Sequence, residues 1–244
     1  MNYEPVPGAK QVEGVWLPDT ETHLQEMMTV TKRVIVDGKG TYQYHKLAMA
    51  MKHVPEDRRR VALDIGAHCG LWSMHLAQLF SNLHAFEPVP LHRELFTRNV
   101  GQPPHVMLWD TALGEVAETV QMEVPVETTG NSHIALGHRH QGARGVGVKN
   151  PEKCFLVDNV KVVPLDSFNF FDVDLIKIDV EGYELRVVKG ARETLLREKP
   201  ILVLEQKGND KEYGDGKDAA LEYCLDLGMK VLDVFSGDYV LGWQ

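Results

Sequence analysis

The sequence predicts an α/β fold, in which helices cover both faces of a mixed, mainly parallel sheet. Short apolar runs of the buried-strand type alternate along the chain with stretches of helical periodicity, which is the pattern of a parallel sheet. Two short strand-like runs flank the turn Ser236-Gly237-Asp238 at the end of the chain, and they indicate an antiparallel hairpin. This hairpin makes the expected sheet mixed.

The elements are expected in the following order. The strands cover residues 61–65, 83–87, 105–110, 119–126, 160–165, 174–180, 201–205, 230–235 and 239–243. Those over 119–126 and 160–165 flank a glycine-rich stretch and stand outside the main alternation. The helices cover residues 70–80, 90–100, 183–197 and 218–227. Pro200 follows the third helix and Gly228 the fourth, and both residue types commonly mark the end of a helix.

Two stretches fit this alternation poorly. The first 60 residues are expected to form an irregular or small helical extension, a lid or a dimer arm ahead of the main domain over 61–244. Within it, Tyr42 and Gln43 would either fold over a ligand or pack the extension against the sheet. The stretch 128–151 has no Asp or Glu, but it has five glycines, three histidines and three Arg or Lys residues. A long loop of this kind is expected to be mobile or to act as a lid.

The composition is that of a globular protein, with 43% hydrophobic and 25% charged residues among 244. A net charge of −9 disfavours general binding to nucleic acids, whose phosphates repel an acidic surface. The run Arg58-Arg59-Arg60 is expected to be a solvated connection and not a nucleic-acid patch. No run of 18 apolar residues and no secretory signal are seen, so we expect no membrane association. Three cysteines without metal-type spacing suggest reduced thiols and a cytoplasmic location.

The strongest candidate for a site is the turn that leaves the first core strand, Asp64-Ile65-Gly66-Ala67-His68-Cys69-Gly70. Gly66 and Gly70 flank a tight connection into a helix, and glycine lets a backbone approach a ligand closely. Open α/β sheets bind ligands at the carboxyl ends of their strands. The spacing G-x-x-x-G differs from the G-x-G-x-x-G of dinucleotide-binding enzymes, which argues against a pyrophosphate cradle.

Glu87 ends the second strand and precedes Pro88. A carboxylate about 20 residues beyond the glycine turn is well placed to accept hydrogen bonds from ribose hydroxyls. The alternative is a surface glutamate that caps the next helix. The preceding turn favours the ribose role.

Lys177, Asp179 and Glu181 alternate along an otherwise apolar strand. Polar groups in a buried strand cost several kcal/mol when they are unpaired. Asp179 and Glu181 come at the carboxyl end of the strand, where they should face the crevice. Alternatively, Asp179 pairs with Lys177 or caps the next helix. The density of acidic residues at a strand end favours a functional role.

These segments together resemble the FkbM family of S-adenosylmethionine-dependent methyltransferases. The resemblance lies in VALDIGAHCGLWS (61–73), HAFEPVP (84–90), TALGE (111–115), VPLDSF (163–168) and DLIKIDVEGYELRVVKGA (174–191). The segments occur in the family's order over roughly residues 60–205, and IKIDVEG is the most specific. The resemblance implies a Rossmann-like class I methyltransferase fold, a seven-stranded sheet whose last strand runs antiparallel.

The resemblance also implies which residues hold the cofactor. The glycine turn would line the methionine and ribose side, Glu87 would hold both ribose hydroxyls, and residues 110–113 would flank the adenine. The residues assigned to the cofactor are Asp64, Gly66, Ala67, His68, Gly70, Leu71, Glu87, Pro88, Asp110, Thr111, Ala112, Leu113 and Asp179. The family commonly has Asn at the position of His68, and the side chains of His68 and Cys69 are expected to point outward.

By the same resemblance, the activity would be O-methylation of a hydroxyl on a sugar or other small metabolite, with S-adenosylhomocysteine as product. Asp179 and Glu181 would stand near the sulfonium and the acceptor. A hydroxyl acceptor needs a base, for which the candidates are Asp179, Glu181 and His133, in that order. The pKa of either carboxylate would have to be raised, whereas that of His133 already suits neutral pH.

Several alternatives stay open. His138 and His140 could bind a divalent metal ion together with Asp179 or Glu181, but no metal ligand is assigned, because histidines in such loops are more often solvated. The expected partner is a small hydroxyl compound, and the chain could form a homo-oligomer. Competing functions are a cofactor-binding assembly protein without catalysis, a nicotinamide-dependent oxidoreductase and a nucleic-acid methyltransferase. The missing G-x-G-x-x-G and the negative charge disfavour the last two.

Overall fold

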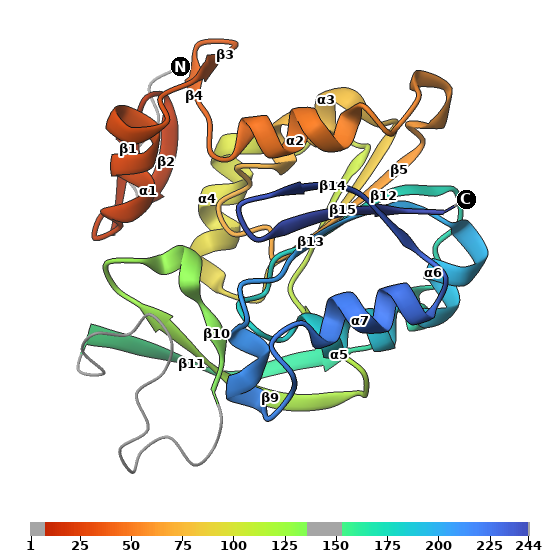
Figure 1. Ribbon diagram of the computed structural model, residues 1–244. Coiled ribbons are helices and arrows are strands. Elements are labelled where there is room, and N and C mark those ends of the chain that lie inside the picture. The colour runs from red at the N-terminus through yellow and green to blue at the C-terminus, as the bar shows by residue number, and fades with distance from the viewer. Residues whose placement is uncertain (1–7, 136–152, 244) are drawn as a thin grey trace.

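The computed structural model describes residues 8–135 and 153–243, and its main body is a seven-stranded sheet between two layers of helices (Figure 1). The strands lie in the order β14-β15-β13-β12-β5-β6-β7. Their bounds are β5 Val61–Ile65, β6 Asn82–Phe86, β7 Val106–Trp109, β12 Val173–Ile178, β13 Ile201–Glu205, β14 Lys230–Phe235 and β15 Asp238–Gly242. Neighbours from β13 to β7 pair in parallel, whereas β15 is antiparallel to β13 and β14. The predicted mixed sheet with an antiparallel last strand is confirmed.

The order of the strands reverses between β5 and β12. From β5 the chain moves outward through β6 to β7, and it later returns to the other side of β5 as β12. In open α/β sheets, such a reversal leaves a crevice at the carboxyl ends of the two central strands, where ligands bind. The predicted site segments follow these two strands.

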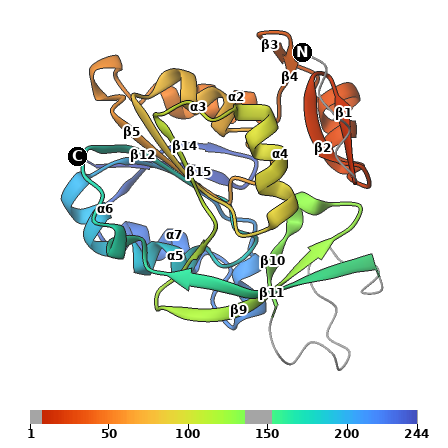
Figure 2. The ribbon, with the colours of Figure 1, turned by 180° about the vertical axis from the view of Figure 1, so that it is seen from behind.

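Helices bury both faces of the sheet (Figures 1 and 2). One layer consists of α2 (Tyr44–Met51), α3 (Ser73–Leu79) and α4 (Pro90–Val100), and the other of α5 (Glu184–Gly190), α6 (Arg192–Glu198) and α7 (Ala219–Asp226). Side chains of β12 alternate between the layers, because Leu175 packs with α2 and α3, whereas Ile176 and Ile178 pack with α5 and α7. No helix in the described part of the chain is long and apolar enough to cross a membrane.

The helix expected over 183–197 is divided into α5 and α6. At the division, Gly190 lies so close to Gly114 that a Cβ would come 1.9 Å from the carbonyl oxygen of Gly114. The carboxylate of Asp166 accepts hydrogen bonds of 2.9 and 2.8 Å from two backbone N–H groups in the first turn of α6. Asp166 thus caps the start of α6 as a separate helix. The spacing of apolar residues along 183–197 does not show this contact, because Asp166 comes from an earlier segment of the chain.

A second sheet of four strands adjoins the main one, in the order β10-β9-β11-β8. Its strands are β8 (Ala112–Leu113), β9 (Glu118–Pro125), β10 (His133–Ile134) and β11 (Cys154–Val163). The two extra strands predicted around the glycine-rich stretch correspond to β9 and to the end of β11, which begins earlier than expected. His138 and His140, considered as metal ligands, lie outside the described residues.

Residues 8–60 contain two hairpins, where the sequence predicted an irregular or small helical extension. β1 (Ala9–Val12) pairs with β2 (Val15–Pro18), and β3 (Ile35–Val36) pairs with β4 (Lys39–Gly40). Their turns, Glu13-Gly14 and Asp37-Gly38, have positive φ at both positions, as in a type I′ turn. An Asp-Gly pair is a strong hairpin signal, so the second hairpin was detectable in the sequence.

The first hairpin is anchored to the main domain by Asn99 on α4. The side chain of Asn99 accepts a hydrogen bond of 2.7 Å from the backbone N–H of Trp16 and donates one of 2.8 Å to its carbonyl. It also donates to the carbonyl of Cys69 in the glycine turn, at 2.8 Å. After the hairpin, α1 (His23–Glu26) continues into a π-helical turn, Met27–Thr31, which precedes β3. The extension is therefore fastened next to the predicted site.

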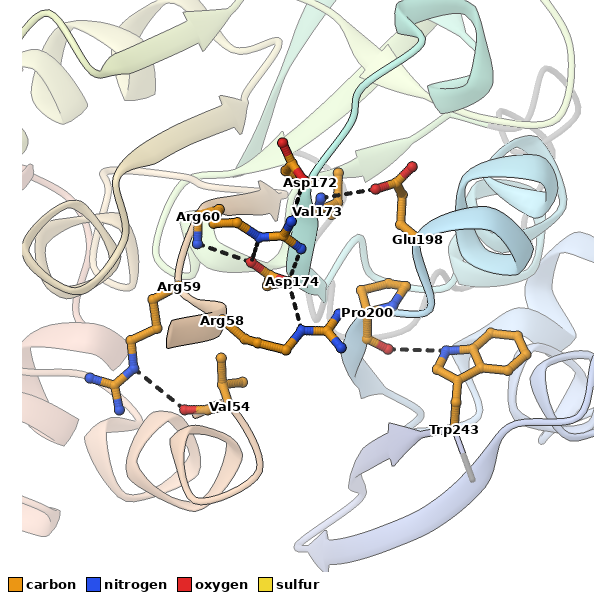
Figure 3. Close-up of polar contacts among 10 residues, drawn as sticks. All are labelled: Val54, Arg58, Arg59, Arg60, Asp172, Val173, Asp174, Glu198, Pro200 and Trp243. Atoms are coloured by element: carbon orange, nitrogen blue, oxygen red, sulfur yellow. Dashed lines mark hydrogen bonds and ion pairs between the residues drawn. The ribbon is translucent and has the colours of Figure 1, made fainter. Parts of the chain in front are cut away.

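Arg58 and Arg60 form ion pairs with Asp174, which corrects the expectation of a solvated connection (Figure 3). Asp174 belongs to the amino-terminal half of β12, and only 2% of its side chain is exposed. It accepts hydrogen bonds from Arg60 Nη2 at 2.7 Å, Arg60 Nε at 2.9 Å and Arg58 Nε at 3.2 Å. Burial alone would raise the pKa of Asp174, but these hydrogen bonds outweigh it and lower that pKa. Two arginines of the basic run therefore balance the negative charge of the buried Asp174 carboxylate.

Candidate active site

An apolar cavity opens at the carboxyl ends of β5 and β6. Its walls come from the glycine turn, the end of β6, the segment between β12 and α5, and the second sheet with its connections. The large apolar and aromatic side chains in these walls are Phe86, Met122, Ile134 and Tyr183. The predicted cofactor residues that line it include Gly66, Glu87, Pro88, Thr111, Ala112 and Leu113. An apolar slot with a few fixed polar groups is typical of small-molecule sites.

A charged cavity adjoins the apolar cavity at the carboxyl ends of β12 and β13. Five ionisable side chains dominate it, those of Lys177, Asp179, Glu181, Glu205 and Lys207. The predicted cofactor residues Ala67 and Leu71 line this second cavity. The residues that line both cavities are Gly66, His68, Gly130 and Asp179. One ligand can therefore reach from the apolar cavity into the charged one.

Two glycines of the turn are required by the geometry, for different reasons. Gly66 has a φ of +76°, and a Cβ there would lie 1.9 Å from the carbonyl oxygen of Asp179. The backbone of the turn thus touches the end of β12, which only glycine permits. Gly70 has a φ of +83°, and its Cβ would meet Val100 and Phe96 on α4 at 2.7 and 2.9 Å. Gly70 lines neither cavity, so the structure assigns it to packing against α4.

Glu87 follows β6, and its carboxylate is fixed by backbone groups. Its Oε2 accepts a hydrogen bond of 2.9 Å from the N–H of His68, and its Oε1 accepts one of 2.8 Å from the N–H of Val89. The His92 ring lies behind it, with Nδ1 3.4 Å from Oε1. Glu87 therefore orders the glycine turn and the start of α4 while it lines the apolar cavity. Its contact with a ribose stays a prediction.

His68 and Cys69 point inward, contrary to the expectation that their side chains face outward. His68 Nε2 lies 3.0 Å from Thr129 Oγ1, and Thr129 Oγ1 donates to Glu21 Oε2 at 2.7 Å. The positive φ of His68, +49°, turns its side chain back into the site. Burial lowers the pKa of His68 well below its ordinary value and raises that of Cys69 well above its own. A neutral imidazole therefore stands where the two cavities meet.

Asp64 lies beneath the site and lines neither cavity. Its fully buried carboxylate accepts a hydrogen bond of 2.7 Å from Ser73 Oγ and lies 3.2 Å from Lys177 Nζ. Lys177 Nζ also donates to the carbonyl oxygen of Gly66 at 2.8 Å and lies 3.9 Å from Asp179 Oδ2. Burial alone would lower the pKa of Lys177, but Asp64 and Asp179 outweigh it and raise that pKa. A buried ammonium group thus joins the turn after β5 to the end of β12.

Three carboxylates gather in the charged cavity, those of Asp179, Glu181 and Glu205. One oxygen atom of each lies within 4.8 Å of the others. Such a group could hold a divalent cation, although Lys177 and Lys207 already bring two positive charges to it. Glu205 and Lys207 were not predicted as site residues. Glu205 ends β13, so the rule that singled out Asp179, an acidic residue at the carboxyl end of a buried strand, applies to it too.

The pKa values of these carboxylates differ. Burial alone would raise the pKa of Asp179, but Lys177 and Lys207 outweigh it and hold that pKa below its ordinary value. Burial and the charge of Asp179 raise the pKa of Glu181 to about 7. The same two causes raise the pKa of Glu205 well above its usual range. Asp179 therefore stays ionised at neutral pH, whereas Glu181 can gain or lose a proton there.

The sequence of this chain matches a family of known proteins over most of its length. The profile of the methyltransferase FkbM domain matches residues 64–231, which is more than half of the chain. The chain belongs to the FkbM methyltransferase domain family. No curated protein matches it. With the family and the sheet order established, the class I methyltransferase fold expected from the sequence is confirmed.

Several solved structures are similar to this FkbM domain at low sequence identity. Methyltransferase FkbM from Methylobacillus flagellatus gives a TM-score of 0.46 at 17% identity, over 77% of this chain and 44% of that one. The present chain thus spans less than half of that protein. N-methyltransferase NodS from Bradyrhizobium japonicum, in complex with S-adenosylhomocysteine, gives 0.46 at 10% identity over 92% of both chains. Precorrin-6y C5,15-methyltransferase from Geobacter metallireducens gives 0.45 at 16% identity, over 88% and 92%.

Two further predicted site residues of the FkbM domain line neither cavity. The ring of His133 on β10 is buried, with Nδ1 3.0 Å from the carbonyl oxygen of Asn131 and Nε2 3.4 Å from a carboxylate oxygen of Glu123. Asp110 is exposed and lies beside a groove between β7 and α4. The local sequence does not show that His133 and Asp110 lie outside the cavities, because their positions depend on how β7 and the second sheet are oriented.

The extension contributes Tyr42 to the charged cavity of the FkbM domain. Burial, reinforced by the charge of Asp179, raises the pKa of Tyr42, so that its hydroxyl group stays protonated. Its neighbour Gln43 accepts a hydrogen bond of 3.3 Å from Trp72 Nε1 and so packs the extension against α3. Gln43 thus has the packing role considered for this pair, whereas contact of Tyr42 with a ligand stays a prediction.

Proposed function

We propose that this FkbM domain transfers a methyl group from S-adenosylmethionine to a hydroxyl group of a small metabolite, with sugars among the candidates. The observation that carries the proposal is the junction of the two cavities, which Gly66, His68 and Asp179 share. The adenosyl part of the cofactor would occupy the apolar cavity and the acceptor the charged one. The sulfonium would then lie at the junction, beside the carboxylate of Asp179.

The residues of the apolar cavity suit an adenosyl group. Each oxygen of Glu87 accepts one backbone hydrogen bond, and a carboxylate has about four acceptor sites, so capacity remains for two ribose hydroxyls. Phe86 and Leu113 offer apolar walls to an adenine ring. Asp179 keeps its negative charge and would attract the cationic end of the cofactor. The absence of a side chain at Gly66 lets the turn touch the backbone of Asp179 and so holds that carboxylate at the junction.

The cofactor supplies an electrophilic methyl group when it is bound, and the residues of the chain supply position and a base. The walls of the charged cavity would hold the acceptor hydroxyl in line with the methyl group, which is the larger part of the catalysis. As the acceptor oxygen bonds to the methyl carbon, the carbon–sulfur bond breaks and sulfur keeps the electron pair. Glu181 would receive the hydroxyl proton.

Glu181 is the preferred base among the three candidates. Its pKa of about 7 lies close to neutral pH, which suits proton transfer. Asp179, the first candidate from the sequence, is a weaker base because Lys177 and Lys207 lower its pKa. His133 lines neither cavity and faces Glu123 instead. We therefore assign Asp179 to holding the cofactor and Glu181 to taking the proton.

The first test of this function is a thermal shift assay with S-adenosylmethionine, S-adenosylhomocysteine and NADH. A ligand at a hundred times its dissociation constant adds about 2.7 kcal/mol of stability. For a chain of this size, that corresponds to a rise in Tm of roughly 5–10 °C. We expect the rise with the two adenosyl ligands and not with NADH. A rise with NADH alone would favour an oxidoreductase and contradict the proposal.

The second test measures methyl transfer from labelled S-adenosylmethionine to a panel of hydroxyl compounds, with amines and an RNA as controls. We expect label in hydroxyl compounds. Binding of the cofactor without transfer to any member of the panel would support a catalytically silent binding protein. Transfer to the RNA would point to a nucleic-acid methyltransferase. Either result would contradict the proposed acceptor class.

A further inference from the structure

A third cavity lies behind Tyr42, between the extension and the end of the sheet. It has a volume of about 100 Å³, several times the roughly 10–15 Å³ that one water molecule needs. Three lysines line it, Lys32, Lys46 and Lys207, and no carboxylate side chain is among its lining residues. Tyr42 and Lys207 also line the charged cavity. The third cavity, here called the lysine cavity, is therefore a side chamber of the candidate active site.

The three lysines of this cavity differ in how far carboxylates neutralise them. Lys46 is buried and pairs with Asp238, and Lys207 pairs with Glu205. Lys32 has no carboxylate within ion-pair distance in the described ranges, and its ammonium group stands 5.8 Å from the ring centroid of Phe235. Lys207 is also attracted by Asp179 and Glu181 of the charged cavity, so Lys32 supplies the unpaired positive charge of the chamber, in a protein whose net charge is −9.

The neighbouring His45 responds to this charge. Burial lowers the pKa of His45, and the positive charges of Lys32 and Lys46 lower it further. The His45 ring packs against Phe235, with centroids 4.4 Å apart, and Lys32 stands over that same phenyl ring. The side chains that line the chamber carry positive charge or none, which favours an anion inside it.

We propose that the lysine cavity binds an oxyanion, a carboxylate or a phosphate, on the methyl acceptor. The proposal rests on the proposed function and narrows its substrate class to anionic hydroxyl compounds. With the anion beside Lys32 and Lys46, the rest of the acceptor passes Tyr42 and presents its hydroxyl to Glu181. A charged group anchored away from the reacting atoms holds the hydroxyl in place, which raises the rate of an in-line transfer. The free ammonium of Lys32 is the main contributor to this anchoring.

The test compares the wild-type chain with Lys32→Glu and with Lys52→Glu as the control. Both lysines are exposed, so neither change should prevent folding, but Lys52 does not line the lysine cavity. Binding of inorganic phosphate, glucose 6-phosphate, glucuronate and glucose is measured by calorimetry, with and without saturating S-adenosylhomocysteine. We expect the wild type and Lys52→Glu to bind at least one anion and to bind glucose more weakly. Reversing the charge at position 32 should weaken anion binding by roughly tenfold.

The outcomes separate the anion site from the proposed function. Binding of glucose 6-phosphate and phosphate identifies a phosphate group, and binding of glucuronate alone identifies a carboxylate. Equal binding of glucose and the anions, no binding of any anion, or equal anion binding by Lys32→Glu and Lys52→Glu would overturn the proposal. A failure to bind S-adenosylhomocysteine would instead contradict the proposed function. The measurements of anion binding made without that ligand would still show whether the lysine cavity binds an anion.

Discussion

The two ends of β12 carry the same kinds of side chain and use them differently. At the amino end, Asp174 is enclosed by Arg58 and Arg60, and both of its oxygens accept hydrogen bonds (Figure 3). At the carboxyl end, Asp179 and Glu181 line a cavity. At the amino end, the arginine hydrogen bonds lower the pKa of Asp174. At the carboxyl end, burial and the charge of Asp179 raise the pKa of Glu181 to about 7. A carboxylate at a strand end is thus available to a ligand only where hydrogen-bond donors of the protein leave it partly unsatisfied.

The difference follows from the direction of the sheet. Parallel strands bring all their carboxyl ends to one edge, so the acidic residues after β12 and at the end of β13 converge there. Three carboxylates share two lysines at that edge, and their pKa values diverge as a result. At the opposite edge, the two arginines that precede β5 meet a single buried aspartate. One end is structural, and the other carries Glu181, a carboxylate whose pKa of about 7 lies near neutral pH.

Gly66→Ala should have the largest effect on stability and on cofactor binding, because Gly66 lies where the carboxyl ends of β5 and β12 are in contact. The new Cβ would lie 1.9 Å from the carbonyl oxygen of Asp179, and a positive φ strains any side chain there. We expect a loss of about 3 kcal/mol or more in the free energy of unfolding and no measurable cofactor binding. Urea denaturation and calorimetry measure the two effects.

Gly216→Ala is the matched control for this change. A Cβ at Gly216 would meet only the Cβ of Ala219, at 3.9 Å, which is ordinary contact. We expect the stability and cofactor affinity of this variant to match the wild type. A Gly66→Ala protein as stable as the control would show that the two strand ends are not in contact, and the cavity junction would be wrong.

Glu181→Gln tests the catalytic end of β12 directly. Loss of the base should lower kcat by about 100-fold, with little change in cofactor affinity. Because only the ionised carboxylate accepts a proton, the wild-type kcat should rise with pH through about 7 and level off above it. The variant should lose this rise. Glu222→Gln, an exposed position on α7, is the control; a wild-type pH profile in Glu181→Gln would remove Glu181 as the base.

Glu87→Ala concerns the cofactor side of the same sheet edge. Charge-assisted hydrogen bonds contribute about 1.5–3 kcal/mol each, so losing the two expected to the ribose hydroxyls should weaken S-adenosylmethionine binding by roughly 100-fold or more. The variant also frees the N–H groups of His68 and Val89, which adds disorder to the turn. Glu94→Ala, at an exposed site on the helix α4 that follows Glu87 and paired with Arg98 at 3.6 Å, is the control. If the affinity of Glu87→Ala for S-adenosylmethionine were unchanged, the expected contact between Glu87 and the ribose would be wrong.

The position of several predicted residues around the two cavities was predictable because their signals are local. A glycine turn, a glutamate and an aspartate each follow directly on an apolar run, and a parallel sheet brings such positions to one edge. The same reasoning supports Glu205 at the end of β13, but a single acidic residue after a strand carries little information until the sheet order shows its neighbours. The cluster of three carboxylates in the charged cavity therefore became visible only in three dimensions.

Other features depended on contacts between distant segments. Arg58 meets Asp174, which lies 116 residues later, and no local pattern links the two. His68 was expected to face outward, but its positive φ and its contact with Thr129 turn it inward. The hairpin at Asp37-Gly38 is the exception, because its turn signal is local and lies in the sequence itself.

Asp174→Asn should have a smaller effect and should leave catalysis intact. Removing a buried partner from a fully buried ion pair costs about 3–5 kcal/mol. Half of each arginine side chain is exposed here, and solvent screens the pair, so we expect a loss of about 2 kcal/mol. Asp172→Asn removes an exposed partner of the same Arg60, and its cost should stay below about 1 kcal/mol. Urea denaturation of both variants measures the difference.

The pH dependence of that difference identifies its origin. The pKa of Asp174 is lowered by folding, so its ion pairs stabilise the protein fully above the unfolded pKa of about 3.9 and are lost as the pH falls through the lower folded value. The gap between the wild type and Asp174→Asn should therefore be constant near neutral pH and shrink in acid. A gap that persists in acid would mean that packing, and not charge, holds the amino end of β12. A fall in kcat would mean that the two ends are coupled.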